Sequence, residues 1–231
     1  MTSPQPRIGV VQFPGSNDDR DALWALAALD AEAVAVWHAE PELPDLDAVI
    51  LPGGFSYGDY LRCGAIARFS PATAAVTEFA AAGGLVLGIC NGFQILCEAG
   101  LLPGVLRLNT SLTFVCRDVR VRAASAETRF TSRCEHDQEL VMPVKHGAGC
   151  WFADEGLYEQ LLARNQIAFR YAEPVNGSLH DVAGVINENG NVMGLMPHPE
   201  HAVDPLLGSA DGAFILASLV DAAREHALAA V

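Results

Sequence analysis

The sequence predicts an α/β fold: a three-layer sandwich with a largely parallel mixed sheet flanked by helices, plus a small antiparallel addition. Three observations predict it. Short apolar runs end at glycine or proline, amphipathic segments of helical period lie between them, and hydrophobic residues make up 51% of the 231 residues, which is enough for a sizeable core. Strands that alternate with helices form parallel β-α-β units, whose sheet is covered on both faces.

Four strands are expected in the first half of the chain, each a short apolar run typical of a buried strand. They cover residues 8–13, 33–37, 48–51 and 85–89. The first run stops at Pro14-Gly15 and the third at Pro52-Gly53, because proline and glycine end regular structure.

Helices are expected between these strands and at the end of the chain. Residues 17–19 offer N-cap oxygens and first-turn negative charge, and apolar residues then recur at helical spacing as far as residue 28. A second helix begins at Pro71 and ends at the two glycines 83–84. A long closing helix fits residues 210–228.

The later chain has a different pattern. Residues 112–121 alternate loosely, and residues 187–191 form a turn signal between two apolar runs. This pattern predicts antiparallel hairpin structure added to the sheet. Since no repeat, low-complexity tract or long linker interrupts the chain, we expect residues 1–231 to form a single domain.

Charge and composition exclude several classes of function. With 14 basic and 28 acidic residues the net charge is −14, which disfavours binding to nucleic acid or to anionic membranes. No apolar run approaches the length of a membrane span, and residues 1–7 lack the apolar core of a signal peptide. None of the six cysteines forms a C-x-x-C pair, so no metal site is expected. We expect a cytoplasmic protein.

The most informative segment is Gly88-Ile89-Cys90-Asn91-Gly92, which has the pattern G-x-C-x-G between an expected strand and helix. A sharp strand-to-helix turn of this kind exposes a nucleophile, and its neighbours two positions away nearly touch, so both must be glycine. The helix N-terminus is expected to favour the Cys90 thiolate. The alternative is a buried strand-end cysteine beside helix-packing glycines, which is the better interpretation for Cys97 and for the other four cysteines.

A thiol nucleophile needs a base, and Pro197-His198-Pro199-Glu200 offers one. Prolines favour extended geometry, in which His198 and Glu200 share a face, so that Glu200 orients the imidazole while His198 faces the sulfur. The adjacent His201 is expected to point to the other face. Taken alone, a histidine in this setting is more often a surface residue in a proline-rich loop, and it is the combination with the Cys90 turn that favours the functional interpretation.

Pro52-Gly53-Gly54 follows a strand that should lie beside the strand of Cys90. Glycine allows a backbone N–H to approach an oxyanion closely, so we expect the amides of Gly54 and Asn91 to form an oxyanion hole. The alternative is a simple strand-ending turn. No phosphate-binding glycine motif occurs in the chain, so no ATP site is expected in it.

Together these segments resemble the class I, triad-type glutamine amidotransferases, whose pattern is P-G-G, then G-x-C-x-G-x-Q, then H-P-E. Within that class the chain resembles the family of glutaminase subunits of phosphoribosylformylglycinamidine synthase. The segments that carry this closer resemblance are residues 10–17, 52–67, 109–117 and 196–200.

The resemblance implies that Cys90 attacks the side-chain amide of L-glutamine, that His198 moves the protons and Glu200 orients it, and that Gln94 binds the amino acid end of the substrate. It also implies two partners in purine biosynthesis. A large ATP- and magnesium-dependent synthase subunit would use the ammonia to convert formylglycinamide ribonucleotide into its amidine, and a small subunit would bridge the two. This chain itself would need no cofactor.

One segment departs from the family pattern. Where the family often has H-G-E-G, this chain has His146-Gly147-Ala148-Gly149. His146 and Gly147 are therefore weaker candidates for substrate binding, and a plain glycine-rich loop is an equal alternative. Other interpretations of the whole chain are a glutaminase of a different amidotransferase, a stand-alone γ-glutamyl cysteine hydrolase, or an inactive scaffold subunit.

Overall fold

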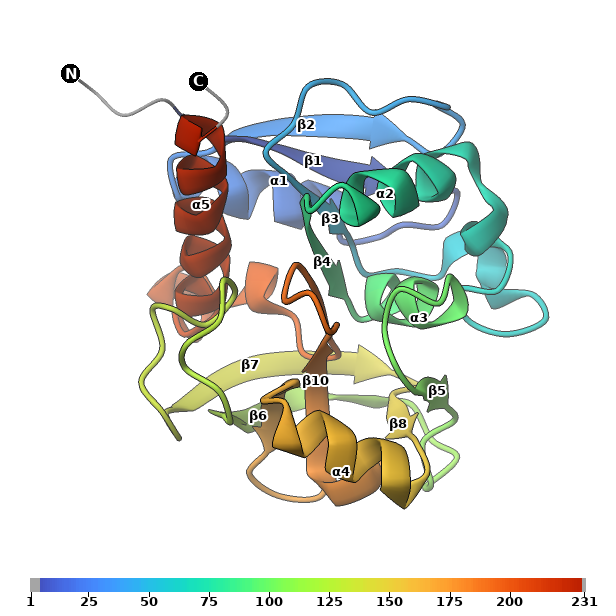
Figure 1. The fold of residues 1–231 in the computed structure, drawn as a ribbon. Helices are drawn as coiled ribbons and strands as arrows, with labels where there is room; N and C mark the ends of the chain where they lie inside the picture. The colour runs from blue at the N-terminus through green and yellow to red at the C-terminus, as the bar shows by residue number, and fades with distance from the viewer. Residues whose placement is uncertain (1–4, 230–231) are drawn as a thin grey trace.

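The structure is a computed structural model that describes residues 5–229. Its centre is one nine-stranded sheet with the strand order β2-β1-β3-β4-β11-β10-β9-β6-β7. Figure 1 shows the N-terminal strands at the top of the molecule and the later strands below them. The mixed α/β class predicted from the sequence is therefore confirmed.

Five neighbouring strands are parallel to one another and make up the first half of the sheet. They are β2 (Glu32–Trp37), β1 (Arg7–Gln12), β3 (Ala48–Leu51), β4 (Leu85–Ile89) and β11 (Val192–Leu195). The first four agree with the predicted strands to within one residue. Every residue of β3, β4 and β11 is buried, because helices cover both faces of this half.

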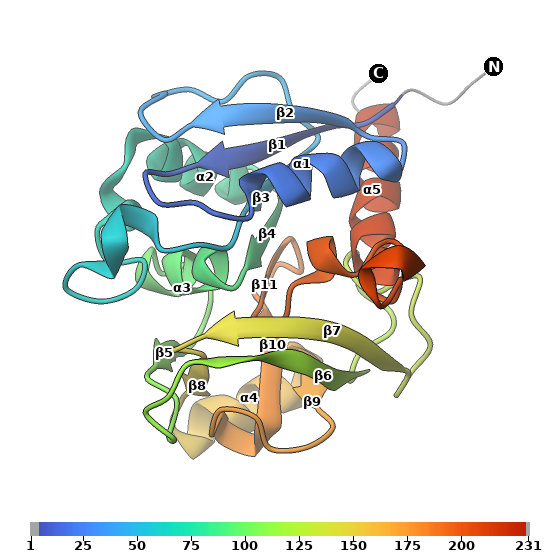
Figure 2. The same ribbon diagram turned by 180° about the vertical axis from the view of Figure 1, so that it is seen from behind.

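The covering helices are α1 (Asp19–Ala28), α2 (Pro71–Ala81), α3 (Asn91–Glu98) and α5 (Gly212–Ala229). Helices α2 and α3 lie in front of the sheet in Figure 1, and α1 lies in front in the reverse view of Figure 2. Helix α2 begins as predicted, with the Ser70 hydroxyl accepting from the Thr73 amide at its N-terminus. On α1 the buried stripe is Ala22, Ala25 and Leu26, while Ala27 and Ala28 are exposed.

The other half of the sheet is antiparallel. It consists of β10 (Val182–Ile186), β9 (Ile167–Tyr171), β6 (Val115–Ala123) and β7 (Glu139–His146), with α4 (Glu155–Ala163) beside it. The hairpin of β10 and β11 turns at residues 187–191, as predicted. A separate two-stranded antiparallel sheet pairs β5 (Val105–Arg107) with β8 (Cys150–Phe152).

This topology brings several chain segments to one edge of the sheet. Strands β1, β3, β4 and β11 are parallel, so the residues that follow them meet at their carboxyl ends. Strand β7 returns to the same edge, because the amide of His198, beyond β11, donates to the Pro143 carbonyl of β7 at 2.9 Å. Among residues 5–229 no helix is both long and apolar enough to cross a membrane.

Candidate active site

Cys90 lies between β4 and α3 with φ 49° and ψ −102°, a left-handed conformation that is rare outside glycine. Its amide donates to the Leu195 carbonyl of β11 at 2.8 Å. A Cβ added to Gly88 would lie 2.7 Å from the carbonyl carbon and oxygen of Gly92, and one added to Gly92 would collide with the Leu51 carbonyl. The geometry of the predicted strand-to-helix turn, with glycine required on both sides, is therefore present.

The pKa of the Cys90 thiol is raised, whereas the sequence predicts a thiolate favoured by the helix N-terminus. Burial raises its pKa well above the ordinary value, and the nearby carboxylates of Asp18 and Glu200 raise it further. Lys145 and the amide of Asn91 act in the opposite direction but do not outweigh these effects. The helix N-terminus is thus insufficient to hold a thiolate here, and the sulfur carries its proton until a base removes it.

His198 and Glu200 form a buried pair. Their side chains have no exposed surface, and Nδ1 of His198 lies 2.6 Å from Oε1 of Glu200. Because the carboxylate accepts a hydrogen bond from Nδ1–H, Nε2 is left as the basic nitrogen. Nε2 of His198 is buried and has no hydrogen-bond partner among the described residues. The predicted pairing is present, and its free nitrogen is the one that general-base chemistry requires.

The backbone that creates this pair is not the extended segment predicted from the prolines. His198 itself is extended, but Pro199–His201 forms a single 3₁₀ turn. The turn also places His201 beside the same cluster, with Nε2 3.1 Å from Oδ1 of Asp18 and its ring centroid 5.5 Å from that of His198. The expectation that His201 points to the other face was wrong, because it assumed an alternation that holds only in a strand.

Asp18 and Lys145 were not predicted as site residues. The Asp18 carboxylate pairs with the Lys145 ammonium, and its second oxygen lies 3.7 Å from Nδ1 of His198. Burial alone would raise the pKa of Asp18, but the hydrogen bond from His201 and the charges of His198 and Lys145 outweigh it and hold that pKa well below its usual range. Asp18 is one of the three residues expected to offer cap oxygens to α1, and it occupies the N-cap position, yet its side chain makes no cap hydrogen bond.

This cluster also has the donor atoms of a cation site. One ligand atom from each of Asp18, His198, Glu200 and His201 lies within 4.8 Å of the others. The Lys145 ammonium already pairs with Asp18, however, and supplies positive charge where a metal ion would. The expectation that this chain needs no metal stays a prediction.

Of the two proposed oxyanion amides, that of Gly54 lies in the loop after β3 and that of Asn91 begins α3. An isolated antiparallel bridge joins Gly54 to Ser16, and its hydrogen bonds are made by the flanking residues: Phe55 N to Gly15 O at 2.8 Å and Asn17 N to Gly53 O at 3.2 Å. The amide of Gly54 takes no part in this pair of bonds. At Asn91, the side-chain oxygen accepts from the Ser56 amide at 3.1 Å, which ties the Gly54 loop to α3.

Next to the sulfur lies a pocket of about 600 Å³, a volume typical of small-molecule sites. Five of the residues predicted from the sequence to form the site line this pocket, namely Cys90, Gly54, Gln94, His146 and Gly147. The amide of Gln94 is already engaged: Nε2 donates to the Ala148 carbonyl at 2.6 Å, and Oε1 accepts from Asn91 at 2.9 Å. Its direct contact with substrate remains a prediction.

The loop at residues 146–149 is held by its carbonyl groups. Gly147 accepts from the Asn109 amide at 2.9 Å, Ala148 from Gln94, and Gly149 from the Asn176 side chain at 2.8 Å. No side-chain carboxylate is part of this framework, so alanine at position 148 is compatible with the loop conformation. Whether His146 and Gly147 bind substrate stays a prediction.

His146 supplies a pH-dependent contribution to stability. Burial and the charge of His198 lower its pKa from 6.5 to about 4. Between these pH values the unfolded chain binds a proton that the folded chain does not, so stability is lost as the pH falls. We expect His146 to lower the free energy of unfolding by about 1.4 kcal/mol at pH 5.5 relative to pH 8.

Urea unfolding of wild type and His146→Gln at both pH values measures this contribution. His146→Gln should lose less free energy of unfolding than wild type between pH 8 and pH 5.5. Substitution of the exposed His226 by glutamine serves as the control. An identical loss in wild type and His146→Gln would contradict the assignment.

Comparison with known proteins identifies the family of this chain. The family model described as a CobB/CobQ-like glutamine amidotransferase domain matches residues 5–211. This chain belongs to that glutamine amidotransferase family. Its nucleophile turn, its buried histidine–glutamate pair and its glycine loop therefore lie in an amidotransferase domain.

The resemblance to one branch of these amidotransferases is also confirmed. The chain is 56% identical to phosphoribosylformylglycinamidine synthase subunit PurQ of Rubrobacter xylanophilus, over 94% of this chain and 99% of the relative. It is 54% identical to PurQ of Mycobacterium tuberculosis, over 94% and 97%. A solved structure of PurLQS from Thermotoga maritima matches with a TM-score of 0.88 and 42% identity, covering 94% of this chain and 99% of that one.

A more distant structure shows the fold alone. A glutamine amidotransferase from Thermotoga maritima has a TM-score of 0.60 at 15% identity, over 97% of this chain and 98% of that one. The same sandwich is therefore shared by amidotransferases whose sequences have diverged widely.

Proposed function

We propose that this chain is the glutaminase subunit of phosphoribosylformylglycinamidine synthase. It hydrolyses L-glutamine and delivers the ammonia to a large ATP-dependent subunit that converts formylglycinamide ribonucleotide into formylglycinamidine ribonucleotide. The observation that carries the proposal is the strained Cys90 turn in the lining of the pocket, together with a buried His198–Glu200 pair whose Nε2 has no hydrogen-bond partner among the described residues. The high identity to PurQ subunits supports the choice of pathway.

In this mechanism His198 Nε2 takes the proton of the Cys90 thiol, and the sulfur attacks the side-chain amide carbon of glutamine. The amides of Gly54 and Asn91 stabilise the oxyanion, and His198 returns the proton to the leaving ammonia. Water then hydrolyses the γ-glutamyl thioester, with His198 as the general base. Glu200 holds the tautomer of His198 throughout.

Large, exposed apolar side chains that line the pocket support a docking surface for the large subunit. Leu61 is 89% exposed and Leu108 65%, and Phe114 and Phe55 are 53% and 43% exposed. All four line the pocket. An exposed apolar patch of this kind is typical of an interaction site, and a partner that covers the pocket would exclude water from the route of the ammonia.

Docking is expected to activate the glutaminase. Hydrolysis without a partner would waste glutamine. Glutamate release should therefore be low for the chain alone and rise when the large and small bridging subunits are added with their ATP and magnesium. Equal rates with and without the partners would contradict this activation.

The docking surface can be tested with Leu61→Asp. A carboxylate at the centre of an apolar interface costs binding free energy, so we expect the dissociation constant for the large subunit to rise ~10-fold or more. Leu206→Asp is the matched control, because Leu206 is 92% exposed but does not line the pocket. Similar binding by both variants would place the interface elsewhere.

A cytoplasmic location is also part of the proposal. It is supported by the six cysteines, all of which are free thiols, as expected in a reducing compartment. We also treat residues 1–231 as one amidotransferase domain, since a single sheet connects both halves of the described chain.

A further inference from the structure

The loop that follows the oxyanion glycines has unusual backbone conformations. Within residues 57–61, four positions have positive φ: Tyr57 at 52°, Gly58 at 69°, Asp59 at 54° and Leu61 at 70°. Left-handed conformations at non-glycine residues cost free energy and persist only where the surrounding structure imposes them. Such strain is typical of segments whose side chains must face a site.

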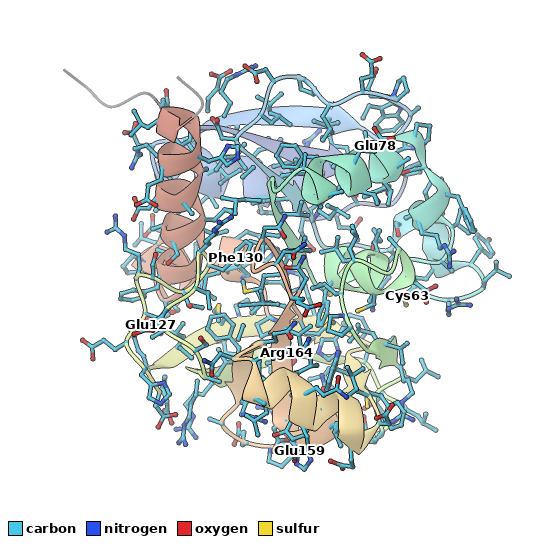
Figure 3. The ribbon with its side chains drawn as sticks, in the orientation of Figure 1. Cys63, Glu78, Glu127, Phe130, Glu159 and Arg164 are labelled. Atoms are coloured by element: carbon cyan, nitrogen blue, oxygen red, sulfur yellow. The ribbon has the colours of Figure 1, made fainter. Side chains whose placement is uncertain are left out.

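The surrounding structure ties this loop to the helix of the nucleophile. Arg62 makes two 2.6 Å hydrogen bonds to Glu98 of α3, and a Cβ on Gly64 would lie 2.8 Å from the backbone of α3. The hydroxyl of Tyr57 lies 2.6 Å from Nδ1 of His38 and anchors the start of the loop. In Figure 3, Cys63 at the end of this loop lies beside α3. Asp59 is therefore held in a fixed position relative to Cys90.

Asp59 lines the pocket with one carboxylate oxygen unused. Oδ2 accepts a hydrogen bond from the Cys63 thiol at 3.1 Å, whereas Oδ1 is buried and has no hydrogen-bond partner among the described residues. Burial raises the pKa of Asp59, which reflects a carboxylate that has lost water without gaining a cation. Asp59 is also the only acidic residue among the described residues that line the pocket.

Three cationic side chains line the same pocket, and two of them are already paired. Arg62 pairs with Glu98, and Lys145 pairs with Asp18. The third, Arg107, lies over the Phe152 ring at 3.7 Å and makes no ion pair within residues 5–229. The pocket is thus lined by one carboxylate without a cationic partner and by one guanidinium group without an anionic partner among the described residues, a pattern that complements an α-amino acid.

We propose that Asp59 accepts the α-ammonium group of the substrate and Arg107 its α-carboxylate, an assignment that presupposes the proposed glutaminase function. The reacting amide carbon of glutamine is three bonds from its α-carbon, so both groups must bind in the pocket that contains Cys90. A buried carboxylate that must pair with a cation rejects an analogue without one, because its charge would stay unpaired. Asp59 and Arg107 would thereby restrict the glutaminase to α-amino acid amides.

The test compares three ligands in the assembled complex with the large and small subunits. These are L-glutamine as substrate, and glutaramate and 4-aminobutanamide as competitive inhibitors, which lack the α-amino group and the α-carboxylate respectively. For Asp59→Asn we expect kcat/KM for glutamine to fall ~30- to 100-fold and the Ki of 4-aminobutanamide to rise similarly. The Ki of glutaramate should change less than about threefold. For Arg107→Gln we expect the same fall in kcat/KM for glutamine, a similar rise in the Ki of glutaramate, and a change of less than about threefold in the Ki of 4-aminobutanamide.

Cys63→Ala separates substrate recognition from loop structure. It removes the other contact of the Asp59 carboxylate, and we expect it to keep the preference between the two inhibitors. If Asp59→Asn weakens glutaramate as strongly as 4-aminobutanamide, or if Cys63→Ala reproduces the Asp59→Asn pattern, the assignment of Asp59 is overturned. A wild-type complex that does not hydrolyse glutamine would instead overturn the proposed function.

Discussion

Replacing Cys90 with alanine is expected to reduce glutamine-dependent synthesis by the assembled complex ~10³-fold or more, while synthesis from added ammonia continues at the wild-type rate. The reason is that, in the proposed mechanism, Cys90 makes the covalent bond to glutamine, whereas the large subunit uses ammonia from any source. The side chain is almost fully buried, so the smaller alanine should not disturb docking. Measuring both activities in one preparation separates loss of chemistry from loss of assembly.

Cys97→Ala provides the matched control. Cys97 lies on the same helix, but its thiol faces the Pro103 carbonyl at 3.9 Å rather than the pocket. An electrophilic glutamine analogue should form one adduct, on Cys90, in both wild type and Cys97→Ala, and none in Cys90→Ala. Glutamine hydrolysis by Cys90→Ala within tenfold of wild type would show that another residue is the nucleophile.

The geometry around the candidate catalytic residues could be predicted because its constraints are local in the sequence. Gly88 and Gly92 are needed within two residues of Cys90, since added side chains would collide with backbone. The His198–Glu200 pair likewise comes from one short segment. The detailed backbone was harder to predict, because the 3₁₀ turn at residues 199–201 and the extended alternative are both compatible with the two prolines.

Asp18 and Lys145 could not be predicted in the same way. They lie 127 residues apart and meet only because β7 returns to the carboxyl edge of the parallel strands. One signal was available: Lys145 is the only lysine in the chain, and it directly precedes the candidate site residue His146. The sequence contains 28 acidic residues, however, and nothing local distinguishes Asp18 from the others.

The antiparallel half of the sheet was also only partly predicted. The turn at residues 187–191 has a strong local signal, and the hairpin of β10 and β11 follows from it. Strands β7 and β9 lack such a signal, because their pairing depends on neighbours far away in the chain. Helix α4 has a local one that was missed: the Asp154 carboxylate accepts from the Leu157 amide at its N-terminus. Asp59 likewise lines the pocket with residues distant in the sequence, so the role proposed for it could be inferred only from the folded structure.

Two buried carboxylates lie near His198, and their substitution is expected to have very different effects. For Glu200→Gln we expect kcat for glutamine hydrolysis in the complex to fall ~10³- to 10⁴-fold, because an amide can present N–H to Nδ1 and stabilise the wrong tautomer. For Asp18→Asn we expect a fall of only ~10-fold, because Asp18 is 3.7 Å from Nδ1 and is already shared by Lys145 and His201.

The KM for glutamine should stay within about threefold of wild type in both variants, since neither carboxylate lines the substrate pocket. Ammonia-dependent synthesis and thermal unfolding report whether each variant still folds and docks. Equal losses of kcat in the two variants would mean that Asp18 and Glu200 orient the histidine together. A larger loss for Asp18→Asn would make Asp18 the orienting residue, despite the 2.6 Å contact of His198 with Glu200.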